Sequence, residues 1–271
     1  MFNPILRDDN IFKSELFTKD AIAFNVMLSI VGDVLKYPDP KVFSDNKNCI
    51  IVNSDADHSV IVWTSDDFID YEQLFDFIKN EFSENNPLKI MSKTGMYHFL
   101  KNSGRVDDDN IKRLGTYKCN KLKSIEYIGQ PDNIIEAEVV TVAEMLLLFS
   151  KETGFDANIN HDENIQSARE FIANPLNKVW RNSEGAIVAM ARIRETEKYG
   201  RLGYVLTIKE ERGKSYAKML VHFLTKSILE TGKTPMLFTN FDYAPSNKCY
   251  TAVGYDLITT IADYKIKTDK I

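Results

Sequence analysis

Residues 204–217, with the sequence YVLTIKEERGKSYA, join a strand pattern to the start of a helix. Tyr204–Ile208 has the composition of a β-strand. The helix that follows has an apolar face made of Ala217, Leu220, Val221, Leu224 and Ile228. A strand that enters a helix through a tight turn leaves backbone N–H groups unpaired, with a partial charge of about +0.5 at the helix start. Such a helix start binds phosphate, although an ordinary tight turn is the plainer interpretation of the stretch taken alone.

The downstream sequence favours the phosphate-binding interpretation over the ordinary tight turn. Pro235–Thr239 predicts another strand, and a loop after Asn240 leads to SNKCYTAVGY, residues 246–255, before a last strand that ends near Ile266. From Ala186 to Ile266 the chain resembles the GNAT family of acyl-CoA-dependent N-acyltransferases. The phosphate loop of that family is Gln or Arg, two residues, Gly, one residue, then Gly or Ala. Arg212, Ser215 and Ala217 occupy these positions, so the middle glycine is replaced, and residues 246–255 are similar to the family's final helix and strand.

The resemblance implies an α/β (α+β) fold for the second half, with a mixed, mostly antiparallel sheet flanked by helices. The pattern predicts helices at Val142–Lys151 and Glu163–Ile172, then a hairpin of Asn177–Asn182 with Ala186–Arg194. The last strand, Ile258–Ile266, alternates apolar and polar residues, which favours a position at a sheet edge.

The resemblance also implies a site for acetyl-CoA as co-substrate, and no metal. In the family the pyrophosphate lies on the loop amides, and the pantetheine arm pairs with the preceding strand like an added strand. Main-chain groups would do most of the binding, because Glu210 and Glu211 repel an anion and only Arg212, Lys214 and Lys218 attract one. The implied cofactor-binding residues are Val205, Leu206, Thr207, Arg212, Gly213, Lys214, Ser215, Tyr216, Ala217, Asn240 and Asn247. Asn247 fits equally well as a residue that serves the first turn of its own helix.

Tyr250 is the catalytic residue that the resemblance implies. The family's tyrosine at this position lies near the thioester sulfur and protonates the departing thiolate as a general acid. For an isolated tyrosine, packing in the core would be the simpler interpretation. The base that deprotonates the acceptor amine has no candidate in the sequence, since Glu195, Glu197, Tyr204 and His222 are better explained as solvated or structural residues.

Ser215 departs from the family pattern. If the backbone φ angle is positive there, a residue with a Cβ costs about 1 to 2 kcal/mol relative to glycine. The serine keeps its N–H and adds a hydroxyl donor, so we expect the change to be tolerated.

The first half predicts a smaller α/β domain. We expect a helix within Ala21–Leu35, a hairpin of Cys49–Asn53 with Val60–Thr64, and a helix near Tyr71–Phe82. A strand at Leu88–Met91, a helix at Gly95–Lys101 and a strand at Leu114–Leu122 complete it.

The order of these elements repeats that of the second half, which favours a degenerate GNAT repeat, with an unrelated α+β domain as the alternative. The stretch between Lys123 and Ile134, which contains Gly129–Asn133, breaks the periodicity and is the expected linker. We therefore expect domains at 1–129 and 134–271. The counterpart of the phosphate loop, Thr64–Phe68, contains Ser65, Asp66 and Asp67. Acidic side chains at a helix start occupy the amides that a pyrophosphate needs, so this half should not bind CoA.

Composition limits the partners. The chain has 271 residues with 34 basic and 39 acidic side chains, a net charge of −5 that argues against nucleic acid as a main partner. The three cysteines form no disulfide or zinc pattern, and neither a secretory signal nor a membrane-spanning run is recognisable, so a cytoplasmic location is expected.

The favoured hypothesis is an N-acetyltransferase that moves an acetyl (acyl) group from acetyl-CoA to a primary amine of a small molecule or peptide, by direct attack of the amine on the thioester. The first alternative is a non-catalytic CoA-binding regulatory module, which the Ser215 substitution allows and the retained Tyr250 disfavours. The second is a tandem transferase with an aminoacyl-tRNA donor, which conflicts with the net charge. The acceptor and the oligomeric state stay open.

Overall fold

The computed structural model describes residues 1–154 and 161–267, and its described residues divide into two compact units. Unit 1 contains residues 1–116, 239–242 and the final segment from Ile258, and unit 2 contains residues 117–238 and 243–257. This division differs from the expected 1–129 and 134–271. The reason is that two long strands, β6 (Val106–Cys119) and β12 (Tyr255–Ile266), each contribute residues to both units.

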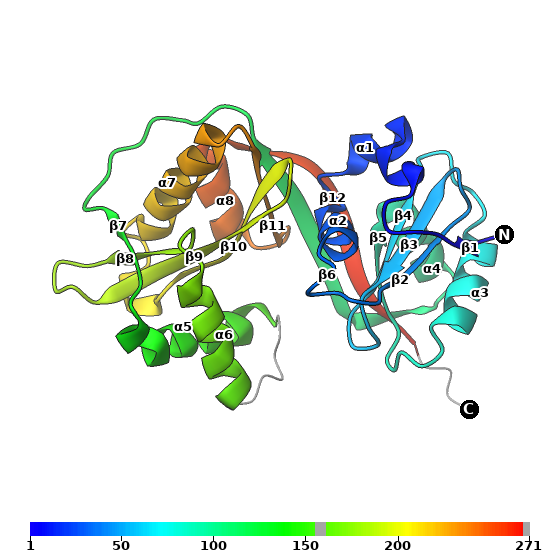
Figure 1. Cartoon of the computed structure of the whole chain (residues 1–271), viewed down its shortest axis with the longest axis horizontal. Coiled ribbons are helices and arrows are strands. Elements are labelled where there is room, and N and C mark those ends of the chain that lie inside the picture. The colour runs from blue at the N-terminus through cyan, green and yellow to red at the C-terminus, as the bar shows by residue number, and fades with distance from the viewer. Residues whose placement is uncertain (155–160, 268–271) are drawn as a thin grey trace. The chain divides into compact units, whose positions relative to one another are not determined.

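Unit 1 is a mixed sheet with helices on both faces (Figure 1). Its strand order is β1-β2-β3-β4-β5-β12-β6. The remaining strands are β1 (Asn3–Pro4), β2 (Lys41–Ser44), β3 (Cys49–Asn53), β4 (Val60–Thr64) and β5 (Lys89–Lys93). The helices are α1 (Glu15–Asp20), α2 (Asn25–Gly32), α3 (Tyr71–Glu81) and α4 (Thr94–Asn102), with a 3₁₀ turn at Asn10–Lys13. Strands β2, β3 and β4 are antiparallel, whereas β4 and β5 are parallel.

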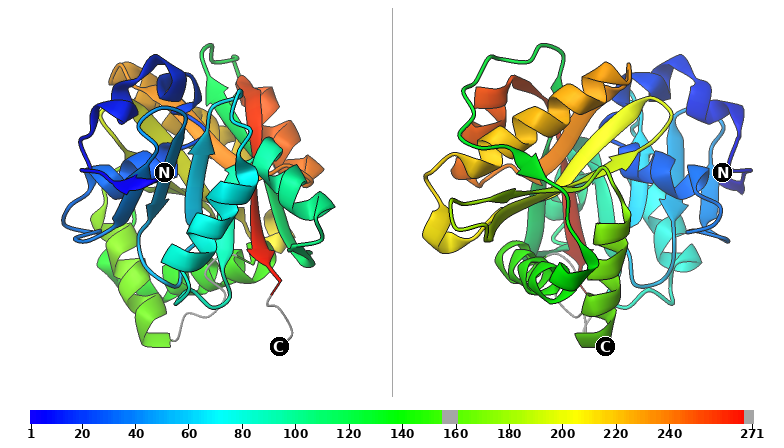
Figure 2. Two further views of the ribbon diagram at one scale, coloured as in Figure 1. Left: turned by 90° about the vertical axis from the view of Figure 1, so that its right-hand side faces the viewer. Right: turned by 60° about the vertical axis from the view of Figure 1, so that its left-hand side comes forward.

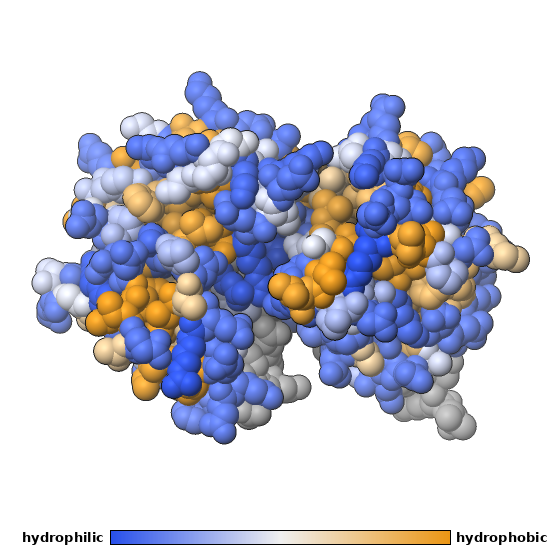
Figure 3. All heavy atoms as spheres, in the orientation of Figure 1, coloured by the Kyte–Doolittle hydropathy of each residue, from blue (hydrophilic) through white to orange (hydrophobic). Residues whose placement is uncertain are grey.

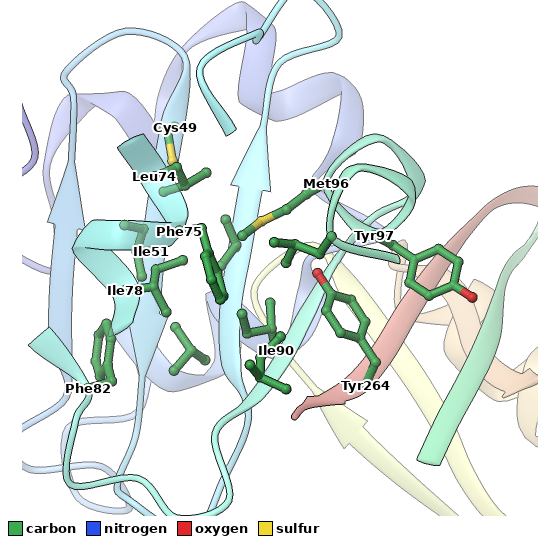
Figure 4. Close-up of a cluster of buried hydrophobic side chains, with 14 of the residues drawn as sticks. Cys49, Ile51, Leu74, Phe75, Ile78, Phe82, Ile90, Met96, Tyr97 and Tyr264 are labelled. Atoms are coloured by element: carbon green, nitrogen blue, oxygen red, sulfur yellow. The ribbon is translucent and has the colours of Figure 1, made fainter. Parts of the chain in front are cut away.

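The core of unit 1 follows from the alternation of side chains along β3 and β4. Cys49 and Ile51 face α3 and α4, where they join a cluster with Leu74, Phe75 and other apolar side chains (Figure 4). On the opposite face, Trp63 packs edge-on against Phe17 of α1, with ring centroids 5.3 Å apart. Because both faces of these strands are covered, every residue of β3 and β4 is buried.

Unit 2 has the same arrangement of strands and a crossover helix. Its strand order is β7-β8-β9-β10-β11-β6. The elements are β7 (Pro131–Asp132), α5 (Val139–Thr153), α6 (His161–Ala173), β8 (Lys178–Arg181), β9 (Ile187–Glu195), β10 (Tyr199–Thr207), α7 (Tyr216–Glu230), β11 (Thr234–Asn240) and α8 (Ala244–Val253), with 3₁₀ turns at Glu136–Glu138 and Lys209–Glu211. Strands β8, β9 and β10 are antiparallel, and β10 is parallel to β11. The strand order that the repeat hypothesis requires is therefore present in unit 1, where β3, β4, α3 and β5 take the places of β9, β10, α7 and β11.

Two pairs of helices cover the sheet of unit 2. Helices α7 and α8 lie on one face and α5 and α6 on the other, as two further views show (Figure 2). Leu220 and Leu224 of α7 pack with Ala191 and Ile193 of β9, whereas Leu146 of α5 packs with strand residues of the opposite face. Apolar side chains gather around α7 and α8 on the face seen in Figure 3. No helix in the two described ranges is both long and apolar enough to cross a membrane.

Three sequence-based expectations need correction. The helix expected through Leu35 ends at Gly32, because the Asp33 carboxylate accepts a hydrogen bond from the Lys36 N–H and turns the chain there. The last strand does not lie at an edge, since β12 is inserted between β5 and β6. Its alternating pattern reflects neighbours above and below the sheet, not a free edge. The strand expected at Leu114–Leu122 is the second half of the longer β6, which begins at Val106 and ends at Cys119, three residues earlier than expected.

Buried tyrosines make the fold sensitive to alkaline pH. Burial raises the pKa of Tyr250, Tyr255 and Tyr264 well above the usual value for tyrosine. The unfolded chain releases these protons above about pH 10, whereas the folded chain retains them. Stability is therefore complete below pH 10 and falls above it, by up to about 1.4 kcal/mol per pH unit for each tyrosine.

We expect urea unfolding curves measured at pH 8, 10 and 11 to show a steep loss between the last two. Tyr264→Phe removes one of the three titrating groups, so the same loss should be shallower in that variant. A free energy of unfolding that stays constant to pH 11 would contradict the prediction.

Candidate active site

Strands β10 and β11 separate part of the way along their length. The two strands pair in parallel only from Tyr199–Leu202 of β10 with Thr234–Leu237 of β11. The register of β10 against β9 then shifts between Gly203 and Leu206, where Tyr204 has a φ angle of 52°. Beyond Leu202, the described residues give β10 no further pairing with β11. Val205, Leu206 and Thr207 therefore lie on a strand edge that an extended ligand can join by main-chain hydrogen bonds.

The bulge is supported on both faces of the Tyr204 ring. Phe149 of α5 stacks on one side, with ring centroids 4.8 Å apart, and the Arg192 guanidinium lies 5.2 Å from the ring centroid. An aromatic residue at positive φ costs about 1 to 2 kcal/mol, and these contacts offset that cost. Tyr204 is thus a structural residue that holds β10 in its bent path.

The loop from Arg212 to Ala217 presents backbone N–H groups at the start of α7. Gly213 and Ser215 have φ angles of 84° and 68°, which turn the chain tightly into the helix. Ser215 is the N-cap residue, and its side chain does not cap the first turn. Within the described residues, no backbone or side-chain acceptor meets the N–H groups of residues 213–218. A row of free donors at the positive end of a helix of this length is suited to a pyrophosphate.

The charged side chains of the loop are mostly paired within the protein. Arg212 donates two hydrogen bonds of 2.6 Å to Glu152 of α5 and a third of 3.0 Å to the carbonyl oxygen of Thr207. Lys214 donates to Glu211 at 2.8 Å, a bond that raises the pKa of Lys214. We expected Arg212 and Lys214 to attract an anion, but the structure uses Arg212 to tie the loop to α5. Lys218 forms no ion pair with any described residue.

A segment outside the expected site closes this region. Residues Lys123–Gly129, which we call the strap, run past the outer side of α7 and α8 (Figure 1). The strap and the loop line a cavity of about 580 Å³ that opens to solvent and lies within the size range of small-molecule sites. Its walls are Ser124, Ile125, Glu126 and Ile128 of the strap; Gly213, Lys214, Ser215, Lys218 and Met219 of the loop and α7; and Ala252 of α8. Sequence reasoning interpreted this segment as part of a linker, because nothing in its local pattern indicates a wall.

His222 explains how the strap is held. Its Nε2 lies 2.9 Å from the carbonyl oxygen of Lys123, and its Nδ1 lies 2.5 Å from the Tyr127 hydroxyl. Burial lowers the pKa of His222, so the neutral ring donates from Nε2 and accepts at Nδ1. The structural interpretation of this histidine is supported, and the ring has no spare nitrogen for acid–base chemistry.

Tyr250 lies on α8 in the core of unit 2. Its side chain is only 7% exposed and packs near Tyr117 and Tyr255, with ring centroids 6.5 and 6.1 Å away. Its hydroxyl has no hydrogen-bond partner in the described part of the chain, unlike that of Tyr255, which pairs with Thr225 at 2.9 Å. The raised pKa of Tyr250 keeps the proton on the oxygen at neutral pH, which is the state that a general acid requires.

Asn240 and Asn247, the two asparagines expected to bind the cofactor, lie outside the loop at the start of α7. Asn240 is exposed at the end of β11 and belongs to unit 1, and its side-chain oxygen accepts a bond of 2.9 Å from the Asp242 N–H. It stabilises the turn after β11, and the structure does not bring it together with the loop in one unit. Asn247 is in the first turns of α8, where its backbone N–H donates to the Tyr243 carbonyl oxygen at 3.4 Å.

Another polar residue considered as the base for the acceptor amine is Glu195. It forms an ion pair of 3.1 Å with Lys233, which agrees with a structural role. Among residues 1–154 and 161–267, no three His, Cys, Asp or Glu side chains come together where they could hold a metal ion.

In unit 1, the helix that follows β4, α3, does not begin with a full set of unpaired N–H groups. Asp70 caps α3 by accepting from the Gln73 N–H at 3.4 Å, and Asp66 pairs with Lys93 at 2.6 Å. A carboxylate therefore occupies an amide of the first turn, although the capping residue is Asp70 and not the expected Ser65–Asp67 group.

The Ser215→Gly variant tests the cost of the positive φ at this position. Glycine removes backbone strain of about 1 to 2 kcal/mol at φ 68°, which stabilises the folded chain. Glycine also has more conformational freedom in the unfolded chain, which opposes folding, so we expect a net stabilisation of about 0.5 to 1 kcal/mol. The Kd for acetyl-CoA should be unchanged or lower. Ser215→Ala is the matched control, because it keeps the Cβ and removes only the hydroxyl. Weaker binding in both variants would show that the hydroxyl is used.

Strands β10 and β11 pair in parallel and splay at a bulge, and α7, the crossover helix that connects them, has free N-terminal amides. This arrangement is that of the GNAT fold. The comparisons agree. Residues 182–263 match the family model described as FR47-like protein, and no curated protein matches the chain.

Three solved structures share the fold over nearly the whole chain. An acetyltransferase of the GNAT family from Colwellia psychrerythraea is 16% identical, with a TM-score of 0.60, over 98% of this chain and 100% of that one. A GCN5-related N-acetyltransferase from Sphaerobacter thermophilus is 11% identical, with a TM-score of 0.70, over 98% and 94%. A tandem GNAT protein from the clavulanic acid biosynthesis pathway is 12% identical, with a TM-score of 0.57, over 98% and 97%. The chain therefore has the fold of the GNAT acetyltransferases, and the resemblance inferred from its sequence is confirmed.

Proposed function

We propose that this protein is an N-acetyltransferase that uses acetyl-CoA and a primary amine of a small molecule or peptide. The observation that carries the proposal is the row of backbone N–H groups at residues 213–218, next to the unpaired strand edge of Val205–Thr207. Together they match a ligand with a pyrophosphate and an extended amide-bearing arm. The likeness to the GNAT acetyltransferases supports the same conclusion.

Acetyl-CoA supplies an activated thioester, and the protein supplies binding and a proton. The loop amides hold the pyrophosphate by hydrogen bonds. The main-chain groups of Val205 and the N–H of Thr207 orient the arm, since the Thr207 carbonyl oxygen already accepts from Arg212. The Arg212–Glu152 pair keeps the loop in the geometry that exposes those amides. The acceptor amine, mostly protonated at neutral pH, loses a proton to a base or a water chain and attacks the thioester carbonyl carbon. The C–N bond forms, the C–S bond breaks, and Tyr250 donates its proton to the departing sulfur.

We further propose a cytoplasmic protein, because its cysteines are unpaired in the structure, which suits a reducing compartment. Binding of nucleic acid or a membrane plays no part in the proposed reaction.

The test starts with calorimetric titration of the full chain with acetyl-CoA. We expect saturable binding with one site. Release of free thiol is then followed spectroscopically with a panel of polyamines, amino acids and short peptides as acceptors.

Binding together with amine-dependent thiol release supports the transferase. Binding without release for any acceptor favours the regulatory module. No binding of acetyl-CoA overturns the proposal, and a shift of tRNA in electrophoresis at moderate salt would then favour the aminoacyl-tRNA donor.

A further inference from the structure

We propose that the strap binds the nucleotide end of acyl-CoA and completes the donor site. This inference rests on the proposed function and assigns residues to the adenosine 3′-phosphate, the part of the donor that the loop and β10 leave unplaced. The pantetheine arm and the pyrophosphate account for the edge of Val205–Thr207 and for the loop amides. The cavity extends from the loop at Gly213–Ser215 to the first turn of α7, the strap and Ala252.

The strap is a fixed wall and not a loose connection. The Lys123 N–H donates to the Val253 carbonyl oxygen at 2.9 Å, and its side-chain Nζ donates to the Thr251 carbonyl oxygen at 2.8 Å. At the other end, the Ile128 N–H donates to the Met219 sulfur at 3.1 Å, and its carbonyl oxygen accepts from the Trp180 indole at 3.2 Å. His222 adds a contact at each end, to the Lys123 carbonyl oxygen and to the Tyr127 hydroxyl, so both ends of the strap are held on unit 2.

Gly254 shows how closely the approach to the strap is packed. The residue ends α8 with a φ angle of 120°, and a Cβ at this position would lie 2.4 Å from the Lys121 carbonyl oxygen. Only glycine allows the chain to pass over the end of α8 at this distance. The position of the strap is thus built into the packing of α8.

The apolar part of the cavity suits a purine ring. Ile125, Ile128 and Met219 contribute to its walls, and Ile128 keeps 75% of its surface exposed although both of its backbone polar groups are hydrogen-bonded. Covering an exposed apolar side chain is favourable because it removes apolar surface from water. A base that lies against Ile128 would provide that cover.

The charges of the cavity orient the phosphate. Lys218 lines the cavity from the first turn of α7 and has no ion pair with any described residue, so its ammonium group can meet the 3′-phosphate. Glu126 lines the cavity from the strap and repels the same phosphate. The 3′-phosphate therefore lies on the α7 side, and the base lies on the side of the strap.

The experiment compares two donors on the full chain by calorimetry. Acetyl-CoA contains the nucleotide, whereas S-acetyl-4′-phosphopantetheine lacks it. We expect Ile128→Ser to raise the Kd for acetyl-CoA about 5- to 10-fold and to leave the Kd for S-acetyl-4′-phosphopantetheine unchanged. Ile135→Ser is the matched control, because Ile135 is 60% exposed in the same unit and lies outside the cavity.

The Lys218→Met variant tests the phosphate end. Wild type should bind acetyl-CoA about 10-fold more tightly than its 3′-dephospho form, and the variant should lose this preference. If wild type binds acetyl-CoA but Ile128→Ser binds it equally well, or weakens both donors alike, the strap proposal is wrong and the proposed function stands. If wild type binds neither donor, the proposed function itself fails.

Discussion

Tyr250→Phe is expected to lower kcat about 10²-fold and to leave both the Kd for acetyl-CoA and the folded structure unchanged. The phenol is the only proton donor assigned to the departing sulfur, and general acid catalysis contributes roughly 10²- to 10⁴-fold. A thiol with a pKa near 8.5 is a fair leaving group, so the effect should fall at the lower end of that range. The readout is amine-dependent thiol release with the best acceptor of the panel.

Stability should hardly change in this variant, because the Tyr250 hydroxyl has no hydrogen-bond partner in the described structure to lose. Tyr255→Phe is the matched control. It removes the 2.9 Å bond to Thr225, so it should cost about 1 kcal/mol of folding free energy and leave kcat within a few-fold. Equal kcat values for wild type and Tyr250→Phe would reject the role as general acid.

The pH profile gives a second check on Tyr250. Burial raises the pKa of the phenol, so its proton is retained well above neutral pH. The activity should therefore show no alkaline decline that is caused by this group below pH 10. A decline with an apparent pKa near 8 that disappears in Tyr250→Phe would show that the tyrosine is exposed and acidic in the working enzyme.

Local patterns predicted the parts of the molecule that depend on near neighbours. The hairpin of Cys49–Asn53 with Val60–Thr64 and the helix at Tyr71 were correct, because side-chain alternation and helical spacing are properties of short segments. The tight turn that joins β10 to the start of α7 was likewise predicted from residues within the turn. The cost expected for Ser215 depends on a positive φ angle, and the structure has a positive φ angle at this residue.

Long-range contacts explain what the sequence could not reveal. Arg212 is paired with Glu152, sixty positions earlier in the chain, so its role as an anchor has no local signal. The insertion of β12 between β5 and β6 depends on residues from opposite ends of the chain. The strap has neither a helix nor a strand pattern, and its hydrogen bonds to α7 and α8 make it a wall.

Ser215→Asp is expected to weaken acetyl-CoA binding about 10²-fold while the protein stays folded. Ser215 is exposed, and aspartate tolerates the left-handed backbone better than most residues, so the fold should accept the change. The new carboxylate would lie beside the N–H groups of residues 213–218, where it competes for the donors and repels the pyrophosphate. Two charges about 5 Å apart at an effective dielectric constant of about 20 interact by about 3 kcal/mol, which corresponds to this factor.

Ser215→Asn separates charge from shape. Asparagine has the size of aspartate and an equal tolerance for positive φ, but it has no charge, so its Kd for acetyl-CoA should stay within about 3-fold of wild type. The difference between the two variants should shrink as salt is raised from 50 to 500 mM, since screening weakens an exposed charge. A Kd that is the same for Ser215→Asp and Ser215→Asn at low salt would mean that the pyrophosphate does not lie on the α7 amides. The donor would then have to bind elsewhere than at the start of α7.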